Sequence, residues 1–569
     1  MTDRPTPGDS APCPTSPPAE LTPAQQQRMV QALAAALGRS GNTPRHVETH
    51  VSHVLLHGGH AYKIKKALAT SFLDQSTLAR RHAACEEELR LNRRLAAHLY
   101  LDVVPITGTP DAPKLGGEGP LLDVAVRMLA FDEAGLWDRL AAGGALCADD
   151  VDELAALLAR FHGAAAAAPA GGTLGRPEPV RAALRSSLRD VHAALPEADD
   201  AGRALVEQVQ RWESETGPRL APVMARRLAS GRVREGHGDL HLGNVARTGS
   251  GCLVFDCIEF ADDFRWLDVI SEVAFLAMDL QAHGLPALAH RFVDTYLQHC
   301  GDYDGVRVLD YYLVHRALVR AKVALLRAAQ ADGNAREQAL AAARRYLGVA
   351  QRTTLPRPHA LLITHGFSGS GKTSLTQGLL EAEGAVRIRA DVERKRLAGL
   401  DALDRAGAAA GSLYTAAMSE ATYARLLDAA TSVLEGGWTA IVDATFLRGA
   451  DRRAAYARAA VLGVPFAVLH FDAPAQVLRE RLKRRAALGA DASDADAAVL
   501  AAQQQAQEPL APDEMPWVHV VQALPDKADA APVADWTALR QWLRSAATDA
   551  QGARAPHPAP RTPAAPAST

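Results

Sequence analysis

The stretch "LLITHGFSGSGKTSLTQGLL", residues 361–380, joins an apolar run, a glycine-rich turn and the start of a helical pattern. The turn fits the pattern G-x-x-x-x-G-K-[ST] in full. In this pattern the glycines let backbone N–H groups face phosphate oxygens, and the positive end of the following helix adds to the attraction. The stretch therefore predicts a nucleotide phosphate site on a strand–loop–helix unit. The residues expected to contact the nucleotide are Gly366, Phe367, Ser368, Gly369, Ser370, Gly371, Lys372, Thr373 and Ser374.

Two side chains of this loop have distinct expected roles. Lys372 is expected to reach the β- and γ-phosphates, and the Thr373 hydroxyl is expected to bind Mg²⁺. No N-K-x-D motif, which would read guanine, accompanies the loop, so ATP is favoured over GTP. ATP and Mg²⁺ are therefore the expected cofactors.

Around the loop, apolar runs alternate with helical stretches, which is typical of a parallel sheet with crossover helices. The runs are "ALLITH", "AVRIRAD", "TAIVDAT" and "PFAVLHFD". Asp391 and Asp443 end two of these runs, so both carboxylates are expected at the carboxyl edge of the sheet, facing the loop. Asp391 could accept a proton from an attacking hydroxyl while Asp443 holds Mg²⁺. Alternatively, each carboxylate caps the helix that follows it.

The run "VLRERLKRR" places several basic residues on one helix. Arg481 and Arg485 are candidates for a lid that closes over the transferring phosphate, because charge develops there and mobile cations stabilise it. A solvated charged face is the alternative interpretation of such a run.

Residues 358–510 resemble the small P-loop kinases of the AAA_33 type, which are kin to polynucleotide 5′-kinase, gluconate kinase and zeta toxins. The resemblance rests on "GFSGSGKTS", "RADVERKRLAG", "GWTAIVDATF" and the arginine-rich helix before "SDAD". It implies that Asp391 acts as a general base and that Arg394 contacts the substrate.

A second informative string is "EGHGDLHLGNVARTGSGCLVFDCIEF", residues 235–260. It contains H-x-D-x-x-x-x-N as His237, Asp239 and Asn244, followed by an apolar strand that leads to Asp256. In a phosphoryl-transfer site, Asp239 would orient and deprotonate an acceptor hydroxyl. Asn244 and Asp256 would hold the metal ions that bridge the phosphates. The string therefore predicts a second site of phosphoryl transfer.

Such a site also needs a lysine that binds phosphate and a glutamate partner. The runs "HVSHVLLHG" and "HAYKIKKAL" predict a hairpin, and the period of a strand puts Lys63 and Lys65 on one face. Lys63 is the preferred lysine and Lys65 the alternative. The following helix, with Ser76 or Thr77 as its N-cap, supplies Glu88 as the preferred partner. Each of these charges could instead be a surface charge.

Residues 45–320 resemble the aminoglycoside phosphotransferase family, which shares the fold of eukaryotic protein kinases. The resemblance is specific at "HGDLHLGN" and "FDCIEF" and weaker at "AYKIKK" and "CEEELRLNRRL". It implies that Asp268 is an acid that buttresses the catalytic loop. One departure is that "LHGGHAY" stands where a G-x-G-x-x-G loop would lie. The order of the two halves resembles proteins labelled bifunctional aminoglycoside phosphotransferase/ATP-binding protein.

The expected fold class is an α+β bilobal protein-kinase-like domain followed by an α/β P-loop NTPase domain with a parallel sheet. A chain of 569 residues is long enough for several folding units. We expect a disordered proline-rich tail over 1–24 and a second disordered tail over 546–569. The kinase-like domain is expected over 25–350, with its small lobe ending at about 130, and the P-loop domain over 356–545.

Bulk properties exclude several classes of protein. The net charge of −3 gives no strong field that would attract nucleic acid or an anionic membrane. No apolar run of about 18 residues predicts a membrane span, and no signal peptide is expected. The six cysteines form no C-x-x-C pair, which favours reduced thiols and a cytoplasmic location over disulfides or zinc.

Together these patterns predict a cytoplasmic, ATP-dependent phosphotransferase with two ATP–Mg²⁺ sites. Its expected partner is a small molecule with a hydroxyl group, such as a sugar, an aminoglycoside-like compound or a metabolite. No membrane or nucleic-acid partner is favoured, although a polynucleotide 5′-hydroxyl stays an alternative acceptor for the P-loop half. In a second hypothesis, the first half is a pseudokinase-like regulatory module. In a third, the P-loop half is an ATPase switch without an acceptor.

Overall fold

The computed structural model describes residues 20–39, 43–70, 73–401, 413, 415–488, 497–521 and 534–552, without the side chains of 485–488 and 546–552. The described chain forms two compact units. The first unit consists of the described residues of 1–137 together with 237–239 and 243–266. The second unit consists of 138–236, 240–242 and the described residues from 267 onward.

The first unit is built on a six-stranded antiparallel sheet with the order β1-β2-β3-β6-β4-β5. A separate antiparallel pair, β8 and β9, follows in sequence. The elements of this unit are α1 (Pro23–Gly38), β1 (Arg45–Glu48), β2 (Ser52–His57), β3 (His60–Lys65), α2 (Leu78–Ala96), β4 (Tyr100–Thr109), β5 (Ala112–Leu115), β6 (Leu121–Leu129), η1 (Glu133–Gly135), β8 (Val245–Thr248), β9 (Gly251–Val254) and α7 (Asp262–Arg265).

The predicted hairpin of β2 and β3 is confirmed. Its turn consists of Gly58 and Gly59, which both have positive φ (59° and 76°), and glycine adopts this conformation without a Cβ clash. Thr77 rather than Ser76 is the N-cap of α2, since its side chain accepts a hydrogen bond from the Arg80 amide.

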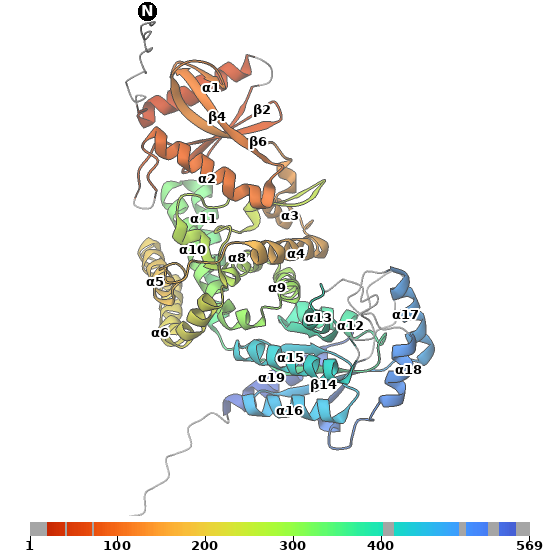
Figure 1. Cartoon of the computed structure of the whole chain (residues 1–569). Coiled ribbons are helices and arrows are strands. Elements are labelled where there is room, and N and C mark those ends of the chain that lie inside the picture. Colours follow the sequence, from red (N-terminus) through yellow and green to blue (C-terminus); the bar gives the residue numbers. More distant parts are fainter. Residues whose placement is uncertain are drawn as a thin grey trace, which may run out of the picture. The chain divides into compact units, whose positions relative to one another are not determined.

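Helices α1 and α2 pack on opposite faces of this sheet (Figure 1). Strand alternation explains why: Leu55 and Ile64 join the core under α1, whereas Ala61 and Val126 join the core under α2. The strands between the two helices are therefore buried on both sides, which fixes the register of β3 and with it the position of Lys63.

The second unit begins with a helical part. Two short elements, η2 (Leu242–Asn244) and β10 (Trp266–Asp268), contain residues of both units. The other elements of the helical part are α3 (Trp137–Ala142), α4 (Ala148–Ala164), α5 (Pro177–Ala194), α6 (Asp200–Ala229), β7 (Val233–Glu235), α8 (Val269–Ala282), α9 (Pro286–Cys300), η3 (Tyr303–Gly305), α10 (Val306–Gln330) and α11 (Gly333–Thr354).

The second unit continues into a five-stranded sheet in which every pairing is parallel, with the order β12-β13-β11-β14-β15. This confirms the predicted α/β domain; the fifth strand, β15, was not predicted. The elements are β11 (Leu361–His365), α12 (Lys372–Glu383), β12 (Val386–Arg389), α13 (Ala390–Leu397), α15 (Ala416–Glu435), β13 (Ala440–Asp443), α16 (Gly449–Leu462), β14 (Phe466–Phe471), α17 (Ala475–Leu488), α18 (Ala497–Ala506), η5 (Met515–Trp517), β15 (Val518–Val521) and α19 (Thr537–Gly552).

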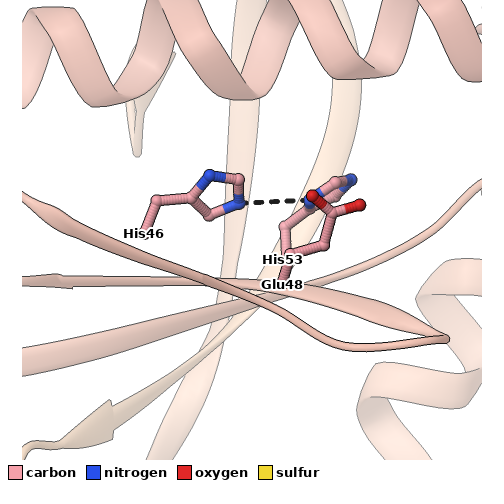
Figure 2. Close-up of side chains that lie close together, drawn as sticks. All are labelled: His46, Glu48 and His53. Carbon is pink, nitrogen blue, oxygen red and sulfur yellow. Dashed lines mark hydrogen bonds between the residues drawn. The ribbon is translucent and has the colours of Figure 1, made fainter. Parts of the chain in front are cut away.

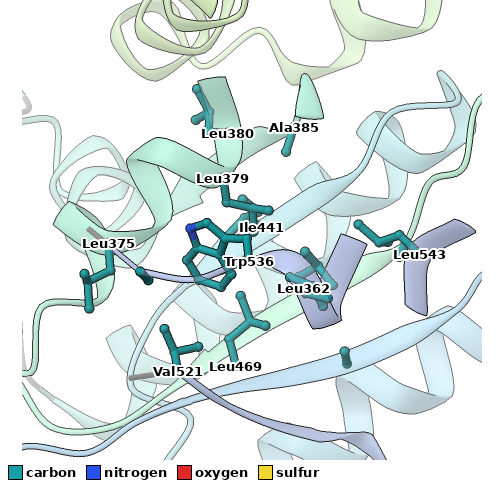
Figure 3. Packing of buried hydrophobic residues seen from close by; sticks show 14 of the residues in the cluster. Leu362, Leu375, Leu379, Leu380, Ala385, Ile441, Leu469, Val521, Trp536 and Leu543 are labelled. Carbon is teal, nitrogen blue, oxygen red and sulfur yellow. The ribbon is translucent and has the colours of Figure 1, made fainter. Parts of the chain in front are cut away.

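One face of the parallel sheet packs against α12 and α19 through a continuous apolar core, shown in Figure 3. Trp536 lies in this core with Leu379 of α12 and with Leu362 and Leu469 of the sheet, all at most 6% exposed. Each buried leucine contributes about 2 kcal/mol of hydrophobic stabilisation. This core holds β11 and α12 firmly on both sides of the loop that joins them.

The ends of the predicted segments differ from the observed elements. Helix α1 begins before residue 25, and α19 runs past residue 545, so both predicted tails overlap a helix at their inner ends. Residues 1–19 and 553–569 of these tails lie outside the described residues. None of the described helices has both the length and the apolar composition that crossing a bilayer requires.

Candidate active sites

The first site forms where β3, α2 and the segment after β9 meet within the first unit. The Lys63 ammonium lies 2.8 Å from Glu88 Oε1 and 2.5 Å from Asp256 Oδ1. Glu88 is fully buried, and the Lys63 side chain is 12% exposed. Three predicted site residues, far apart in sequence, therefore meet at one ammonium group.

The alternative lysine belongs to the same cluster. Lys65 Nζ lies 2.5 Å from Glu88 Oε2 and also pairs with Glu259, whose role we did not predict. The two lysines thus share one glutamate, as expected for strand neighbours two residues apart. The signal for Glu259 was present in "FDCIEF", three residues after Asp256.

The charges of this cluster stabilise one another. Burial alone lowers the pKa of the Lys63 ammonium, but Asp256 and Glu88 outweigh it and raise that pKa well above its ordinary value. Burial raises the pKa of the Glu88 carboxyl, and Lys63 with Lys65 lowers it below its ordinary value. Lys63 and Glu88 are therefore both charged at neutral pH, and each compensates the other, whereas burial raises the pKa of the Glu259 carboxyl.

The loop of Asp239 is held to the segment of Asp256 by His237. His237 is buried; its Nε2 lies 2.8 Å from the Phe255 carbonyl oxygen and its Nδ1 lies 3.2 Å from the Asp239 amide nitrogen. Because a carbonyl only accepts and an amide N–H only donates, these two bonds require the neutral Nε2–H tautomer. The Ile258 amide adds a third hydrogen bond between the two segments, donating to the His237 carbonyl oxygen at 3.0 Å.

Asn244 is bonded to the same loop. Its side-chain nitrogen donates to the Asp239 carbonyl oxygen at 2.9 Å and lies 3.4 Å from Asp239 Oδ2. Since the NH₂ group is engaged with Asp239, the amide oxygen is the atom that Asn244 can offer to a cation.

Asp256 has the unusual backbone angle φ = 67°, in the left-handed region that residues other than glycine rarely adopt. Burial raises the pKa of its carboxyl, but Lys63 outweighs burial and makes the net pKa lower than usual; Asp239 is a weaker influence that raises it. The two carboxylates are thus close enough to repel each other. A strained backbone that keeps like charges together is a feature of functional sites.

The acid that buttresses the loop differs from the one that the resemblance implied. Asp268 N-caps α8 through the Ile270 amide and forms a bidentate pair with Arg227, at 2.7 and 2.8 Å. The loop amide of Leu242 instead donates to the buried Asp279 at 2.9 Å. The expectation for Asp268 was therefore wrong, because α8 begins directly after it and uses it as a cap.

The second site is the loop between β11 and α12. A Cβ on Gly366 would lie 2.4 Å from the Phe471 carbonyl oxygen, so only glycine lets the loop pass so close to β14. Lys372 Nζ donates to the carbonyl oxygens of Gly366 and Phe367, at 2.9 and 2.8 Å. The ammonium therefore lies over the loop that the motif predicts.

Thr373 and Asp443 meet at this loop. The Thr373 hydroxyl donates to Asp443 Oδ2 at 2.6 Å, and Asp443 ends β13, the neighbour of β11. The N-cap of the next helix, α16, is Arg448, so Asp443 does not cap that helix. Ser370 Oγ is buried and has no hydrogen-bond partner among the described residues, which suits a loop shaped for a polar ligand.

Asp391 lies on a helix rather than at a strand end. Strand β12 ends at Arg389, and Asp391 falls in the first turn of α13, where a carboxylate favours the helix dipole. Its Oδ1 accepts a hydrogen bond from Arg394 at 3.0 Å. The two residues that the family resemblance pairs are therefore in contact, one helical turn apart.

Helices α17 and α18 pack against the same loop. Arg481 lies 3.5 Å from the Gly369 carbonyl oxygen. Gln503 of α18, which we did not predict, accepts from the Ser368 amide and donates to the Ser368 hydroxyl, both at 3.0 Å. The side chain of Arg485 lies outside the described residues.

Both sites suit ATP and Mg²⁺. The first offers hard oxygen donors on Asp239, Asn244 and Asp256, which Mg²⁺ prefers, beside a lysine for phosphate. The second offers a backbone cradle, a lysine at its mouth and a hydroxyl–carboxylate pair.

Comparison with known proteins supports two domains. The family model "Phosphotransferase enzyme family" matches residues 61–309, and the family model "AAA domain" matches residues 361–510. The uncharacterized protein Rv2004c of Mycobacterium tuberculosis is 32% identical over 466 residues, which cover 80% of this chain and 89% of that protein.

Among solved structures, a gluconokinase from Sinorhizobium meliloti is similar at 20% identity and TM-score 0.23, covering 35% of this chain and 97% of that one. A choline/ethanolamine kinase family protein from Mesorhizobium loti is similar at 12% identity and TM-score 0.33, covering 58% of this chain and 100% of that one. The chain belongs to the same family as the mycobacterial protein and is an ATP-dependent kinase acting on hydroxyl groups, with a phosphotransferase-family domain ahead of an AAA-type P-loop domain.

Proposed function

We propose that this kinase has two separate ATP–Mg²⁺ sites and that each transfers the γ-phosphate of ATP to a hydroxyl group of a small molecule. The observation that carries the proposal is the Lys63 ammonium held between Glu88 and Asp256. The cluster supports the proposal because it joins a lysine that can bind phosphate to a carboxylate near Asp239, and a complete P-loop follows in the same chain.

In the first site, Asp239 is the proposed general base. Its carboxylate accepts the proton of the acceptor hydroxyl while the hydroxyl oxygen forms a bond to the γ-phosphorus. The bond from the γ-phosphorus to the bridging oxygen breaks, and ADP leaves. Bound Mg²⁺ would neutralise charge on the phosphates from positions held by Asn244 and Asp256. Lys63 orients the phosphates, and Glu88 orients Lys63.

In the second site, the proposed base is Asp391 and the proposed metal-binding pair is Thr373 and Asp443. Lys372 would exchange its bonds to loop carbonyls for bonds to the β- and γ-phosphates. Arg394, already bonded to Asp391, would contact the acceptor. Arg481, beside Gly369, is the proposed lid residue, together with Arg485.

For the acceptor we propose a sugar, an aminoglycoside-like compound or another hydroxylated metabolite, because a net charge of −3 gives no field for nucleic acid. We also propose a cytoplasmic location. Cys85 and Cys257 are buried and free, and free thiols are typical of a reducing compartment.

Two variants of the full chain test the proposal. Asp239→Ala and Lys372→Ala should each remove one of two activities in a γ-³²P transfer assay against a metabolite panel, by about 10²-fold or more. The exposed Asp111→Ala, in the turn between β4 and β5, and the partly exposed Lys322→Ala in α10 are matched controls.

The outcomes distinguish the alternatives. If Asp239→Ala leaves all transfer intact while Lys372→Ala abolishes it, the first half is a regulatory module. Release of free phosphate without any labelled metabolite would make the P-loop half a switch. Full turnover in EDTA would contradict the role of Mg²⁺ at both sites.

A further inference from the structure

The edge of the first unit's sheet carries a cluster that neither kinase site uses. His46 and Glu48 lie on β1, and His53 lies on β2. One donor atom from each residue lies within 4.8 Å of the other two. Figure 2 shows the two imidazoles facing each other, with the Glu48 carboxylate beside His53.

Strand geometry explains the cluster. His46 and Glu48 are two residues apart on β1 and so point to the same face. Glu48 is directly opposite His53 in the antiparallel register, which places their side chains together on that face. The arrangement therefore depends on the fixed register of β1 against β2 rather than on a chance approach of long side chains.

The spacing of the two imidazoles suits a shared metal ion. His46 Nε2 and His53 Nδ1 are 3.2 Å apart. Two nitrogen ligands bound to Zn²⁺ at about 2.0–2.1 Å in a tetrahedron are separated by about 3.3–3.4 Å. Only a small adjustment would convert the present contact between the rings into coordination of one ion.

One of the three residues is buried and the other two are exposed to solvent. His53 is 3% exposed, so its ring has a fixed orientation, whereas His46 and Glu48 are exposed and give an ion access from solvent. Glu48 Oε1 accepts a hydrogen bond from Lys66 at 2.7 Å. A carboxylate has two oxygens and about four lone-pair positions, so Glu48 can keep this bond and still ligate a metal.

We propose that His46, Glu48 and His53 bind a divalent transition-metal ion of the Zn²⁺ class. Two imidazoles and a carboxylate form a donor set that suits Zn²⁺ and leaves a fourth position for water. This chemistry differs from that of the two kinase sites, whose oxygen ligands suit Mg²⁺. The inference goes beyond the proposed function and does not depend on it.

The bound ion would link the outermost strand, β1, to its neighbour β2. Strand β1 is the edge of the sheet and pairs with β2. Strand β2 in turn pairs with β3, where Val54 lies opposite Lys63. A metal that joins β1 to β2 would therefore stabilise the layer of sheet that carries the phosphate-binding lysine.

The test is a Zn²⁺ titration of tag-free full-length protein, stripped of metal and kept in excess Mg²⁺ so that the kinase sites are occupied. Competition with a chromophoric chelator should show one Zn²⁺ ion per chain in the wild type. His46→Ala and Glu48→Gln change exposed side chains, and each should weaken this site by about 100-fold or more. His98→Ala removes an exposed imidazole from the same unit and is the matched control, with unchanged affinity.

A second measurement separates coordination from indirect effects. X-ray absorption at the zinc edge of the one-to-one complex should show two imidazole nitrogens with the remaining ligands oxygen, and one imidazole fewer in His46→Ala at high Zn²⁺. The proposal is overturned if the wild type binds no Zn²⁺ ion in excess Mg²⁺, or if His46→Ala and His98→Ala bind it equally well.

Discussion

The two sites hold a lysine ammonium in opposite kinds of surroundings. Lys63 is held by side-chain carboxylates from α2 and from the segment after β9, 25 and 193 residues away. Lys372 is held by main-chain carbonyls six and five residues before it. The first site therefore depends on charges that the whole unit brings together, and the second on the local shape of one loop. Substitutions should harm the two sites in different ways.

The largest expected effect follows from removing the carboxylate that two lysines share. Glu88→Gln leaves Lys63 and Lys65 buried with one partner fewer each, and breaking a buried pair costs about 3–5 kcal/mol. Urea unfolding of the full chain should show this loss in the transition of the first unit.

The matched control for this substitution lies on the same helix. Glu86→Gln changes an exposed side chain and should alter the free energy of unfolding by less than about 0.5 kcal/mol. Equal effects of the two substitutions would mean that the charge cluster does not stabilise the first unit. They would contradict the statement that the first site depends on buried charges.

Two buried carboxyl groups, Asp294 and Glu88, should respond to acid with opposite signs. Burial raises the pKa of Asp294 in α9 to about 6 from 3.8, although Arg387 opposes the shift. The folded state then binds more protons than the unfolded state, so stability falls as pH rises from about 3.8 to about 6. Conversely, on acidification from pH 7 to below pH 4 the Asp294 carboxyl should contribute about 3 kcal/mol of stabilisation.

The Glu88 carboxyl has a lowered folded pKa, so its contribution is present above about pH 4.5 and is lost only as pH falls below that value. Hydrogen exchange at pH 7 and pH 5, corrected for intrinsic rates, should show more protection at β12 in acid. Because Asp294 accepts the Arg387 amide, that amide is the best probe. An Asp294→Asn variant should lose the response; a response of the same size in this variant would assign it to another group.

The smallest expected effect concerns loop shape. Gly366→Ala adds a methyl group 2.4 Å from the Phe471 carbonyl at φ = 144°, where side chains are strained, and should cost about 1–3 kcal/mol in loop stability and nucleotide binding. Gly378→Ala, in α12 with open space around it, should instead stabilise by about 1 kcal/mol.

Calorimetric titration of each glycine variant with ATP measures this difference. Weakened binding at one site in Gly366→Ala, with the other site unchanged, is the expected result. Equal ATP affinity in Gly366→Ala and Gly378→Ala would show that the loop does not need its present shape.

The difference between the sites also explains what the sequence could predict. The loop of Lys372 is contiguous, so its motif and the strand and helix around it were legible without a structure. Lys63 and Glu88 were found from strand and helix periodicity. Glu259 was not, because its approach to Lys65 depends on the path of the backbone after β9, and the double role of Glu88 depends on how α2 packs against β3.

Other misses have similar physical causes. Strand β15 lies at the edge of the sheet and is mostly not buried, so it lacks the continuous apolar run that marks the equally short β12 and β13. Gln503 reaches Ser368 from 135 residues away, and nothing local marks an uncharged amide as a loop contact. Asp268 matched a family position, but the start of α8 gives it a capping role that a motif does not report.

The central claim is that one chain binds two ATP molecules at two unlike sites. Equilibrium dialysis of the full chain with Mg²⁺ and a non-hydrolysable ATP analogue tests it most directly. We predict two bound nucleotides per chain in the wild type and one in Lys372→Ala. A single bound nucleotide in the wild type, or two in Lys372→Ala, would contradict the account.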